Sequence, residues 1–388
     1  MLKVWQKYWN LGGGYHGRLL RFYVIHLPDD HDETYQRAQI IRARHHFGAF
    51  AIVGARGAAR TEAVEQGLVD FGESDRPLSF YEQGHPFAYS IAMNRTQERH
   101  VAAELICKQF AGKPPGSING QQDPTFDYDA PRRWGAVIKT DADDTGAVDL
   151  YTERLGGCGT ELAYIHDYDL EGTAAGAAAR MKTAGVTSVI VDIASTDAAL
   201  LTAEADSLGY YPEYIVAGGR GLDTNKAGRA MSPQQARHAV GISPAARKAD
   251  RNDWYRAYKK VDPDTKPVDR HFRVLTHLTA GIHAAGATLT PDTLWQGLKA
   301  WEGENDTSPA ASGAYRDRLG PVHLAERLDP TFVDDVSLIW FDPEAFDPSS
   351  GQPGAWRHVW DGTRFPLTQI PTHPIPWFKS GQVYAGCC

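Results

Sequence analysis

Short apolar segments alternate with segments of helical length twice along this 388-residue chain, and this alternation constrains the fold more than any other feature. Strands separated by helices of about 10–15 residues are typical of βαβ units, which build a parallel sheet. A polar segment rich in Gly, Pro, Asn, Gln and Asp, residues 111–132, separates the two series. The sequence therefore predicts an α/β protein with two lobes, each containing a doubly wound parallel sheet.

The expected elements follow from apolar runs and from the glycines and prolines that bound them. In the first series we expect helices over 1–10, 34–47, 60–66 and 96–110, and strands over 19–26, 50–53, 76–79 and 88–93. In the second series we expect strands over 134–138, 161–165, 186–193 and 213–216, and helices over 145–155, 173–183 and 197–208. Two more helices are predicted over 273–285 and 291–301, and short strands and turns from residue 331 onward.

Composition excludes several classes of protein. A formal net charge of -8 argues against a nucleic-acid partner, whose binding surface is basic. The longest apolar runs are far shorter than the roughly 20 residues that span a bilayer. The first ten residues contain no apolar segment of the kind found in a secretory signal.

Three motifs resemble known binding sites, but the residues around each of them argue against that function. Residues 12–17 match G-x-G-x-x-G, but the expected order is helix, glycines, strand, which is the reverse of a dinucleotide site. Residues 141–146 resemble half a calcium loop, but Thr152 stands where a bidentate Glu is required. The spacing of six between His271, His277 and His283 does not place them on one helical face. We predict no metal site and no cofactor.

No nucleophile occurs in a known catalytic motif, so the sequence predicts a protein that is not an enzyme. Two loops of small residues remain, Gly54–Thr61 and Ala217–Gly221, each at the end of an expected strand. Ligands of open α/β sheets bind at the carboxyl ends of strands, and small residues let backbone N–H groups approach an anion. A tight strand–helix turn without a ligand is the alternative for both loops.

The order of several short motifs resembles one family. These are Trp9–Arg18, Asp29–Asp30, Ala51–Gly54, Pro77–Ser79, Asp143–Gly146, Ala184–Val186 and Gly209–Pro212. Together they resemble the type I periplasmic solute-binding proteins, in the leucine/isoleucine/valine-binding branch of ABC importers. The resemblance covers about residues 1–300 and continues more weakly to about 365.

The resemblance implies two lobes joined by a multi-strand hinge, with the ligand between them. The first lobe would comprise residues 1–95 plus 265–310, and the second 96–262 plus 311–388. The implied function is delivery of a small ligand to an ABC permease by hinge closure, by a monomer outside the cytoplasm. The alternative is an enzyme or small-molecule sensor with the same two-lobed fold.

The ligand-binding residues that the resemblance implies come from both lobes. They are Arg56, Gly57, Ala58, Ala59, Ser79, Phe80, Tyr81, Thr145, Ala194, Ser195, Gly219 and Arg220. Ala58 stands where the family has a hydroxyl residue for an amino acid's carboxylate, and Thr145 replaces an aromatic residue. The acidic residue for the ammonium group would fall near Gly219–Arg220. We therefore expect an anionic, carboxylate-bearing ligand, contacted by Arg56, Arg60 and Arg220, in place of a leucine-type zwitterion.

Family members begin with a strand that this chain does not show before its first helix. Without that strand, residues 19–26 lose their main ladder partner. We expect the natural polypeptide to start upstream, with its export signal. The alternative is that the C-terminal tail supplies the strand.

The resemblance also places the ends of two second-lobe helices, near Cys107 and Cys158, on the same side of that lobe. We predict a disulfide between them, which implies an oxidising compartment. Two free buried cysteines are the alternative. Cys387 and Cys388 form an adjacent pair without an assigned role.

Overall fold

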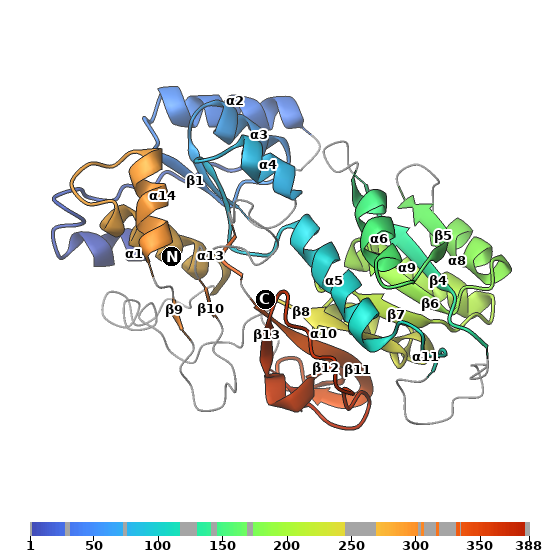
Figure 1. The fold of residues 1–388 in the computed structure, drawn as a ribbon. Helices are drawn as coiled ribbons and strands as arrows, with labels where there is room; N and C mark the ends of the chain where they lie inside the picture. Colours follow the sequence, from blue (N-terminus) through green and yellow to red (C-terminus); the bar gives the residue numbers. More distant parts are fainter. Residues whose placement is uncertain are drawn as a thin grey trace.

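The computed structural model describes residues 2–27, 32–72, 76–116, 130–140, 146–168, 174–244, 269–301, 304–305, 316–317, 331–333 and 335–384. They form two α/β bodies that lie side by side, with helix α5 between them (Figure 1). We call the body that contains α1–α4 the first lobe and the body that contains β4–β8 the second lobe.

The first lobe contains a three-stranded parallel sheet in the order β1-β2-β3. Its strands are β1 (Ala51–Val53), β2 (Val69–Gly72) and β3 (Ala88–Ser90). Its helices are α1 (Leu2–Asn10), α2 (Glu33–His45), α3 (Ala58–Glu65), α4 (Leu78–Gln83), α13 (Asp269–Ala284) and α14 (Pro291–Ala300). Phe71 and Tyr89 stack on neighbouring strands with centroids 4.8 Å apart, and they pack against Leu278 of α13 and Leu294 of α14.

The second lobe is built on a larger sheet in the order β14-β12-β11-β8-β7-β6-β4-β5, with β13 paired to β11. The strands β4 (Trp134–Ile138), β5 (Leu162–Asp167), β6 (Ser188–Asp192), β7 (Glu213–Val216) and β8 (Ala239–Ser243) are parallel. The strands β11 (Asp335–Asp347), β12 (Gln352–His358), β13 (Arg364–Pro366) and β14 (Gln382–Val383) extend it in antiparallel pairs. Two short strands, β9 (Glu304–Asn305) and β10 (Arg316–Asp317), form a separate pair.

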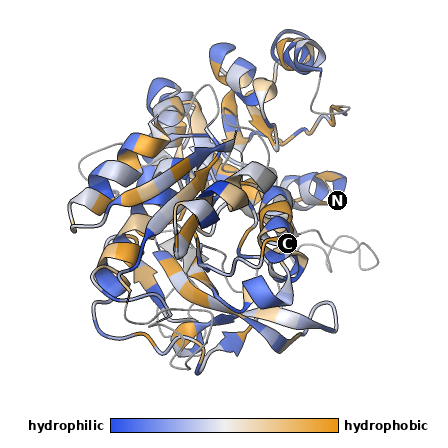
Figure 2. Ribbon diagram, turned by 90° about the vertical axis from the view of Figure 1, so that its right-hand side faces the viewer, coloured by the Kyte–Doolittle hydropathy of each residue, from blue (hydrophilic) through white to orange (hydrophobic). Residues whose placement is uncertain are grey.

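Helices cover both faces of this sheet and bury their apolar sides against it. They are α5 (Arg95–Gln109), α6 (Ala147–Gly156), α8 (Ala174–Thr183), α9 (Ser195–Ser207), α10 (Asn225–Ala230) and α11 (Pro233–Ala236), and a 3₁₀ turn η1 follows β12 at Val359–Gly362. Leu105 of α5 and Tyr151 of α6 belong to one core cluster, and Ala177 of α8 and Leu201 of α9 belong to the other. Hydropathy colouring shows hydrophilic residues alternating with hydrophobic ones along these helices (Figure 2).

The chain passes between the lobes at two described places that are hydrogen-bonded to each other. Residues 91–94 connect β3 to α5, and residues 331–333 lie just before β11. Ser90 and Thr331 form a parallel bridge, and the Phe332 amide donates to the Ser90 carbonyl at 3.0 Å. Residues 245–268, between β8 and α13, lie outside the described residues. The exact lobe boundaries stay a prediction.

The predicted disulfide is confirmed. Cys107 near the end of α5 is bonded to Cys158, which follows α6, with a Cα–Cα distance of 5.6 Å. The alternative of two free cysteines is therefore wrong. No helix in the described part of the chain is long and apolar enough to cross a bilayer.

The strand predicted over 76–79 is wrong, because Pro77 precedes helix α4 and the strand lies at β2 instead. The strand predicted over 19–26 is also wrong, because these residues pair with no strand of the described chain. Side chains of α1 satisfy this backbone: Asn10 Oδ1 accepts from the Leu20 amide and Gln6 Oε1 from the Phe22 amide, each at 2.8 Å. Tail residues 335–384 pair only within the second sheet, so they do not supply a strand to the first.

Candidate functional site

Charged side chains gather where the parallel strands of the second sheet end. Asp192 is the last residue of β6, Lys139 follows β4, and Arg220 lies four residues beyond the end of β7. Carboxyl ends of parallel strands meet at one edge of a sheet, the edge at which open α/β folds bind ligands. The first turns of α5 bring Glu98 and Arg99 to the same edge. We call Glu98, Arg99, Tyr151, Asp192 and Arg220 the Asp192 cluster.

Asp192 holds two guanidinium groups. Its Oδ2 lies 2.6 Å from Arg99 Nε, and its Oδ1 lies 3.4 Å from Arg220 Nε. The Arg99 and Asp192 side chains are 1% and 4% exposed, whereas Arg220 is 13% exposed. The Arg99–Asp192 pair is therefore structural, since breaking a buried pair leaves a charge without compensation. Arg220 lies farther from Asp192 than Arg99 does, and its side chain is more exposed to solvent.

Arg220 adopts a backbone conformation that L-residues with side chains seldom occupy, with φ +54. Its Nη2 donates to the Lys139 carbonyl at 3.1 Å, which ties the loop after β7 to the end of β4. Such strain persists where surrounding contacts fix it, and it is common at ligand sites. The loop therefore places the Arg220 guanidinium in a set position at the sheet edge.

Glu98 is buried beside this loop. A Cβ added to Gly219 would collide with the Glu98 carboxyl oxygens, so a larger residue there would force this carboxyl group to move. Burial, followed by the neighbouring Asp192 carboxylate, raises the pKa of Glu98 to about 8. The nearby arginines oppose this rise without cancelling it. Glu98 is therefore mostly uncharged at neutral pH.

Tyr151 reaches the cluster from α6. Burial raises the pKa of its phenol well above the usual value, and the Asp192 carboxylate adds to the effect. Its hydroxyl group is buried and forms no hydrogen bond with another described residue. A buried hydroxyl without a partner has hydrogen-bonding capacity left for a bound molecule.

In the first lobe, the loop after β1 is partly exposed. Arg56 and Gly57 are exposed, Gly57 with φ +49 precedes α3, and Ala58 and Ala59 are buried. Because Ala58 has no hydroxyl, this loop can offer a ligand only backbone groups and the Arg56 side chain. These residues lie at the carboxyl end of β1, as expected.

Arg60, which was expected to contact a ligand, forms contacts inside the first lobe. Its side chain is fully buried, Nε lies 2.7 Å from Asp70 Oδ2, and Nη2 donates to the Tyr89 carbonyl at 3.1 Å. The guanidinium therefore joins α3 to the first sheet. Its expected contact with a ligand stays a prediction that these bonds do not favour.

The other expected residues are spread over two helices. Ser79 is exposed, Phe80 half-buried and Tyr81 buried on α4, while Ala194 and Ser195 are half-buried at the start of α9. Thr145 lies outside the described residues. The structure thus brings Gly219 and Arg220 into one cluster, and it adds Glu98, Arg99, Tyr151 and Asp192, which the sequence reasoning missed. The signal for Asp192 was available, as an acidic residue that ends an apolar strand.

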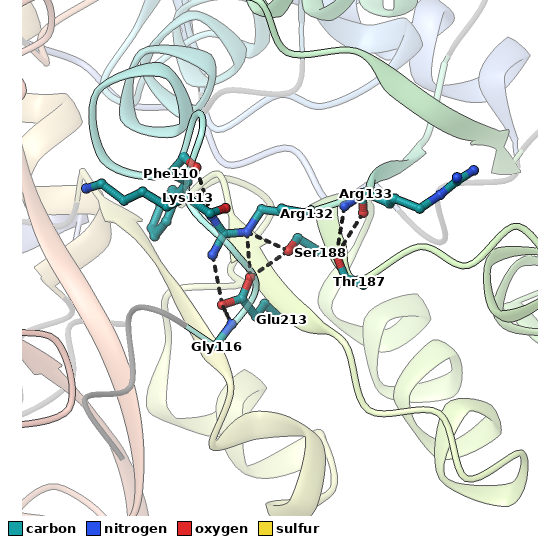
Figure 3. Close-up of polar contacts among 8 residues, drawn as sticks. All are labelled: Phe110, Lys113, Gly116, Arg132, Arg133, Thr187, Ser188 and Glu213. Carbon is teal, nitrogen blue, oxygen red and sulfur yellow. Dashed lines mark hydrogen bonds and ion pairs between the residues drawn. The ribbon is translucent and has the colours of Figure 1, made fainter. Parts of the chain in front are cut away.

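A second ion pair lies at the opposite edge of the same sheet, where the strands begin (Figure 3). Arg132 Nε lies 2.9 Å from Glu213 Oε2, and Arg132 Nη1 donates to the Phe110 carbonyl at 2.8 Å. Glu213 also accepts from the Gly116 amide at 2.7 Å and from the Ser188 hydroxyl. The Arg132 and Glu213 side chains are only 2% and 1% exposed, so this pair anchors the chain before β4. Within the described residues, no group of three His, Cys, Asp or Glu side chains could hold a metal ion.

No protein-family model and no curated protein matches the chain. Solved structures do match its fold. A leucine-, isoleucine-, valine-, threonine- and alanine-binding protein from Brucella ovis has a TM-score of 0.64 and 14% identity, covering 95% of this chain and 91% of that one. An ABC transporter solute-binding protein from Rhodopseudomonas palustris HaA2, in complex with p-hydroxybenzoic acid, has a TM-score of 0.63 and 12% identity, covering 96% and 93%.

A type 1 periplasmic binding protein from Bordetella pertussis Tohama I has a TM-score of 0.59 and 15% identity, covering 92% of this chain and 93% of that one. The sequence identity is low, but the structural similarity extends over nearly the whole of each chain. It therefore shows a common fold. The chain has the two-lobed α/β fold of type I periplasmic binding proteins, as the sequence predicted.

Proposed function

We propose that this chain is a solute-binding protein that captures a small carboxylate-bearing ligand between its two lobes and delivers it to an ABC permease. The proposal is supported by a fold that matches ABC transporter binding proteins over most of the chain. One of these proteins is in complex with p-hydroxybenzoic acid, and another is described as a leucine-, isoleucine-, valine-, threonine- and alanine-binding protein. Location outside the cytoplasm, as a monomer, is part of the same proposal, and the disulfide agrees with an oxidising compartment.

The two guanidinium groups held at Asp192 are the observation that carries the proposed ligand class. With Glu98 uncharged, Arg99 and Arg220 contribute two positive charges and Asp192 one negative charge. Arg95, one turn earlier on α5, adds another positive charge to the surroundings of Glu98. A site with surplus positive charge favours an anion and disfavours an ammonium group.

Ligand capture in this geometry depends on both lobes. Arg220 would bind the ligand's carboxylate at the edge of the second sheet, and the loop at Gly57–Ala58 would approach from the first lobe with backbone N–H groups. A ligand that contacts both lobes stabilises the closed arrangement, because only that arrangement offers both sets of contacts.

The test is isothermal titration calorimetry with benzoate, 4-hydroxybenzoate and leucine. We expect the carboxylic acids to bind and leucine to bind more weakly. Arg220→Met should weaken benzoate binding about 10- to 100-fold, the value of a hydrogen-bonded charge pair. Arg237→Met is the matched control, because Arg237 is an exposed arginine just before β8, at the opposite edge of the sheet. Tighter binding of leucine than of the acids would refute the proposed ligand class.

One observation favours a second candidate function, an enzyme or sensor on the same fold. A carboxyl group with a pKa near 8 in a ligand site has the property of a general acid. We favour the carrier because the described cluster contains no nucleophile beside Glu98. Prolonged incubation with bound ligands, followed by NMR, tests this choice: the carrier returns every ligand unchanged, and a chemically altered ligand would support the enzyme.

A further inference from the structure

Glu98 belongs to the ligand site of the proposed function, on which this inference rests. Glu98 lies in the first turn of α5, and this turn is held from several sides. The Leu78 amide of α4 donates to Thr96 Oγ1 at 3.1 Å, and the Thr331 hydroxyl donates to Gln97 Oε1 at 3.0 Å. Asn94 and Gln97 cap the helix reciprocally. Glu98 is therefore rigidly placed where the two lobes meet.

The Glu98 carboxyl group lies against the backbone of Gly219, next to Arg220 in the chain. Glu98 is buried, with 5% of the residue exposed. The nearby hydroxyl of Tyr151 is buried and forms no hydrogen bond with another described residue. A buried carboxyl group and a buried hydroxyl group with unused hydrogen-bonding capacity thus lie near the guanidinium that we assign to the ligand's anion.

We propose that the ionisation of Glu98 determines ligand affinity. When Glu98 is uncharged, its O–H group donates a hydrogen bond to the ligand's anionic group beside Arg220. When Glu98 is ionised, its carboxylate repels that group and pairs with Arg220 instead. A protonated carboxyl group is a hydrogen-bond donor, whereas a carboxylate only accepts. Glu98 is thereby a specificity-determining residue that selects anions at neutral pH and releases them at alkaline pH.

Five charged or titratable groups of the described chain lie near Glu98 and enter this balance. They are Arg95 and Arg99 on α5, Tyr151 on α6, Asp192 at the end of β6, and Arg220 after β7. Burial and Asp192 keep the proton on Glu98, while the three arginines favour its loss. Asp192 pairs with Arg99 at 2.6 Å, and the pKa of about 8 for Glu98 means that its own charge changes just above neutral pH.

The test measures the dissociation constant of benzoate at pH 6.5 and pH 9.5, because benzoate itself does not titrate in this range. If only uncharged Glu98 supports binding, a pKa of about 8 predicts that wild-type affinity falls about 30-fold between these two values. In Glu98→Gln the affinity should change less than 3-fold over the same range, because the amide donates at both values. Glu104→Gln on the same helix is the matched control, and it should keep the wild-type profile.

The outcomes separate this inference from the proposed function. Binding with an affinity that is independent of pH, or an unchanged profile in Glu98→Gln, overturns the inference alone. Absence of benzoate binding at both pH values contradicts the proposed ligand class and the inference with it. If Glu98→Gln does not fold, ¹³C NMR titration of glutamate carboxyl groups in the wild type decides: benzoate should raise the pKa of Glu98, and an unchanged or lowered pKa overturns the inference.

Discussion

The Cys107–Cys158 disulfide offers a prediction whose magnitude follows from the structure. The bond joins residues 51 positions apart and connects α5 to the loop after α6. Closing a loop of that length in the unfolded chain removes conformational entropy worth about 4 kcal/mol at 25 °C. The double substitution Cys107→Ala with Cys158→Ala should lower the free energy of unfolding by about that amount.

Urea denaturation followed by far-UV circular dichroism measures this effect. The assay should use a background with Cys387→Ala and Cys388→Ala, so that no other thiol can exchange with the pair. Addition of dithiothreitol should bring the disulfide-containing protein to the stability of the double variant and leave the double variant unchanged. Since α5 carries Glu98 and Arg99 and α6 carries Tyr151, the loss of the bond should also weaken benzoate binding if it loosens the packing of these two helices.

A stability difference below about 1 kcal/mol would contradict this reasoning. It would mean that the unfolded chain already brings the two cysteines together, or that the bond strains the folded state by an offsetting amount. A difference that persists in dithiothreitol would show that the alanine side chains, and not the lost bond, cause the change.

Three further substitutions test the Asp192 cluster in the same denaturation assay. Asp192→Asn leaves Arg99 and Arg220 without their carboxylate and should cost about 3–5 kcal/mol, whereas Asp342→Asn, in a more exposed pair, should cost less than about 1 kcal/mol. Gly219→Ala should cost about 1–3 kcal/mol through the collision with Glu98, whereas Gly156→Ala, with open space around it, should not destabilise. Because folding raises the pKa of Glu98 from 4.5 to about 8, its stabilising contribution is fully present below pH 4.5 and is lost as the pH rises towards 8. The wild type should therefore lose stability relative to Glu98→Gln between pH 5 and pH 8, and parallel pH profiles of the two proteins would contradict the burial of this carboxyl group.

The sequence was sufficient to predict the parts of the fold that rest on continuous apolar runs. Strands β4 and β7 have the predicted bounds, because Trp134–Ile138 and Glu213–Val216 are buried runs bounded by polar residues and turns. Strand β2 was missed because Val69–Gly72 is short and carries Asp70 in its centre. That aspartate is buried only because Arg60 reaches it from α3, a tertiary contact that no local pattern reveals.

The candidate site was harder to predict for the same physical reason. Glu98 and Arg99 are adjacent charged residues on a helix, a pattern that normally marks a solvent-exposed face. Both are buried because the first turns of α5 lie at the strand ends of the second sheet, where Arg99 pairs with Asp192. For Arg60 the sequence-based expectation differed in the other direction. This cation near a strand–helix loop was expected to contact a ligand, but it forms a buried pair with Asp70. The loop at Gly219–Arg220 could be identified because its glycines follow a buried strand directly.

The most direct test of the account is the crystal structure of the protein with benzoate bound. We predict that the carboxylate lies within hydrogen-bond distance of the Arg220 guanidinium and of the Glu98 carboxyl group, with the Gly57–Ala58 loop of the first lobe on its other side. Benzoate bound away from the carboxyl ends of both sheets, or bound at Arg132 on the opposite edge, would contradict the account.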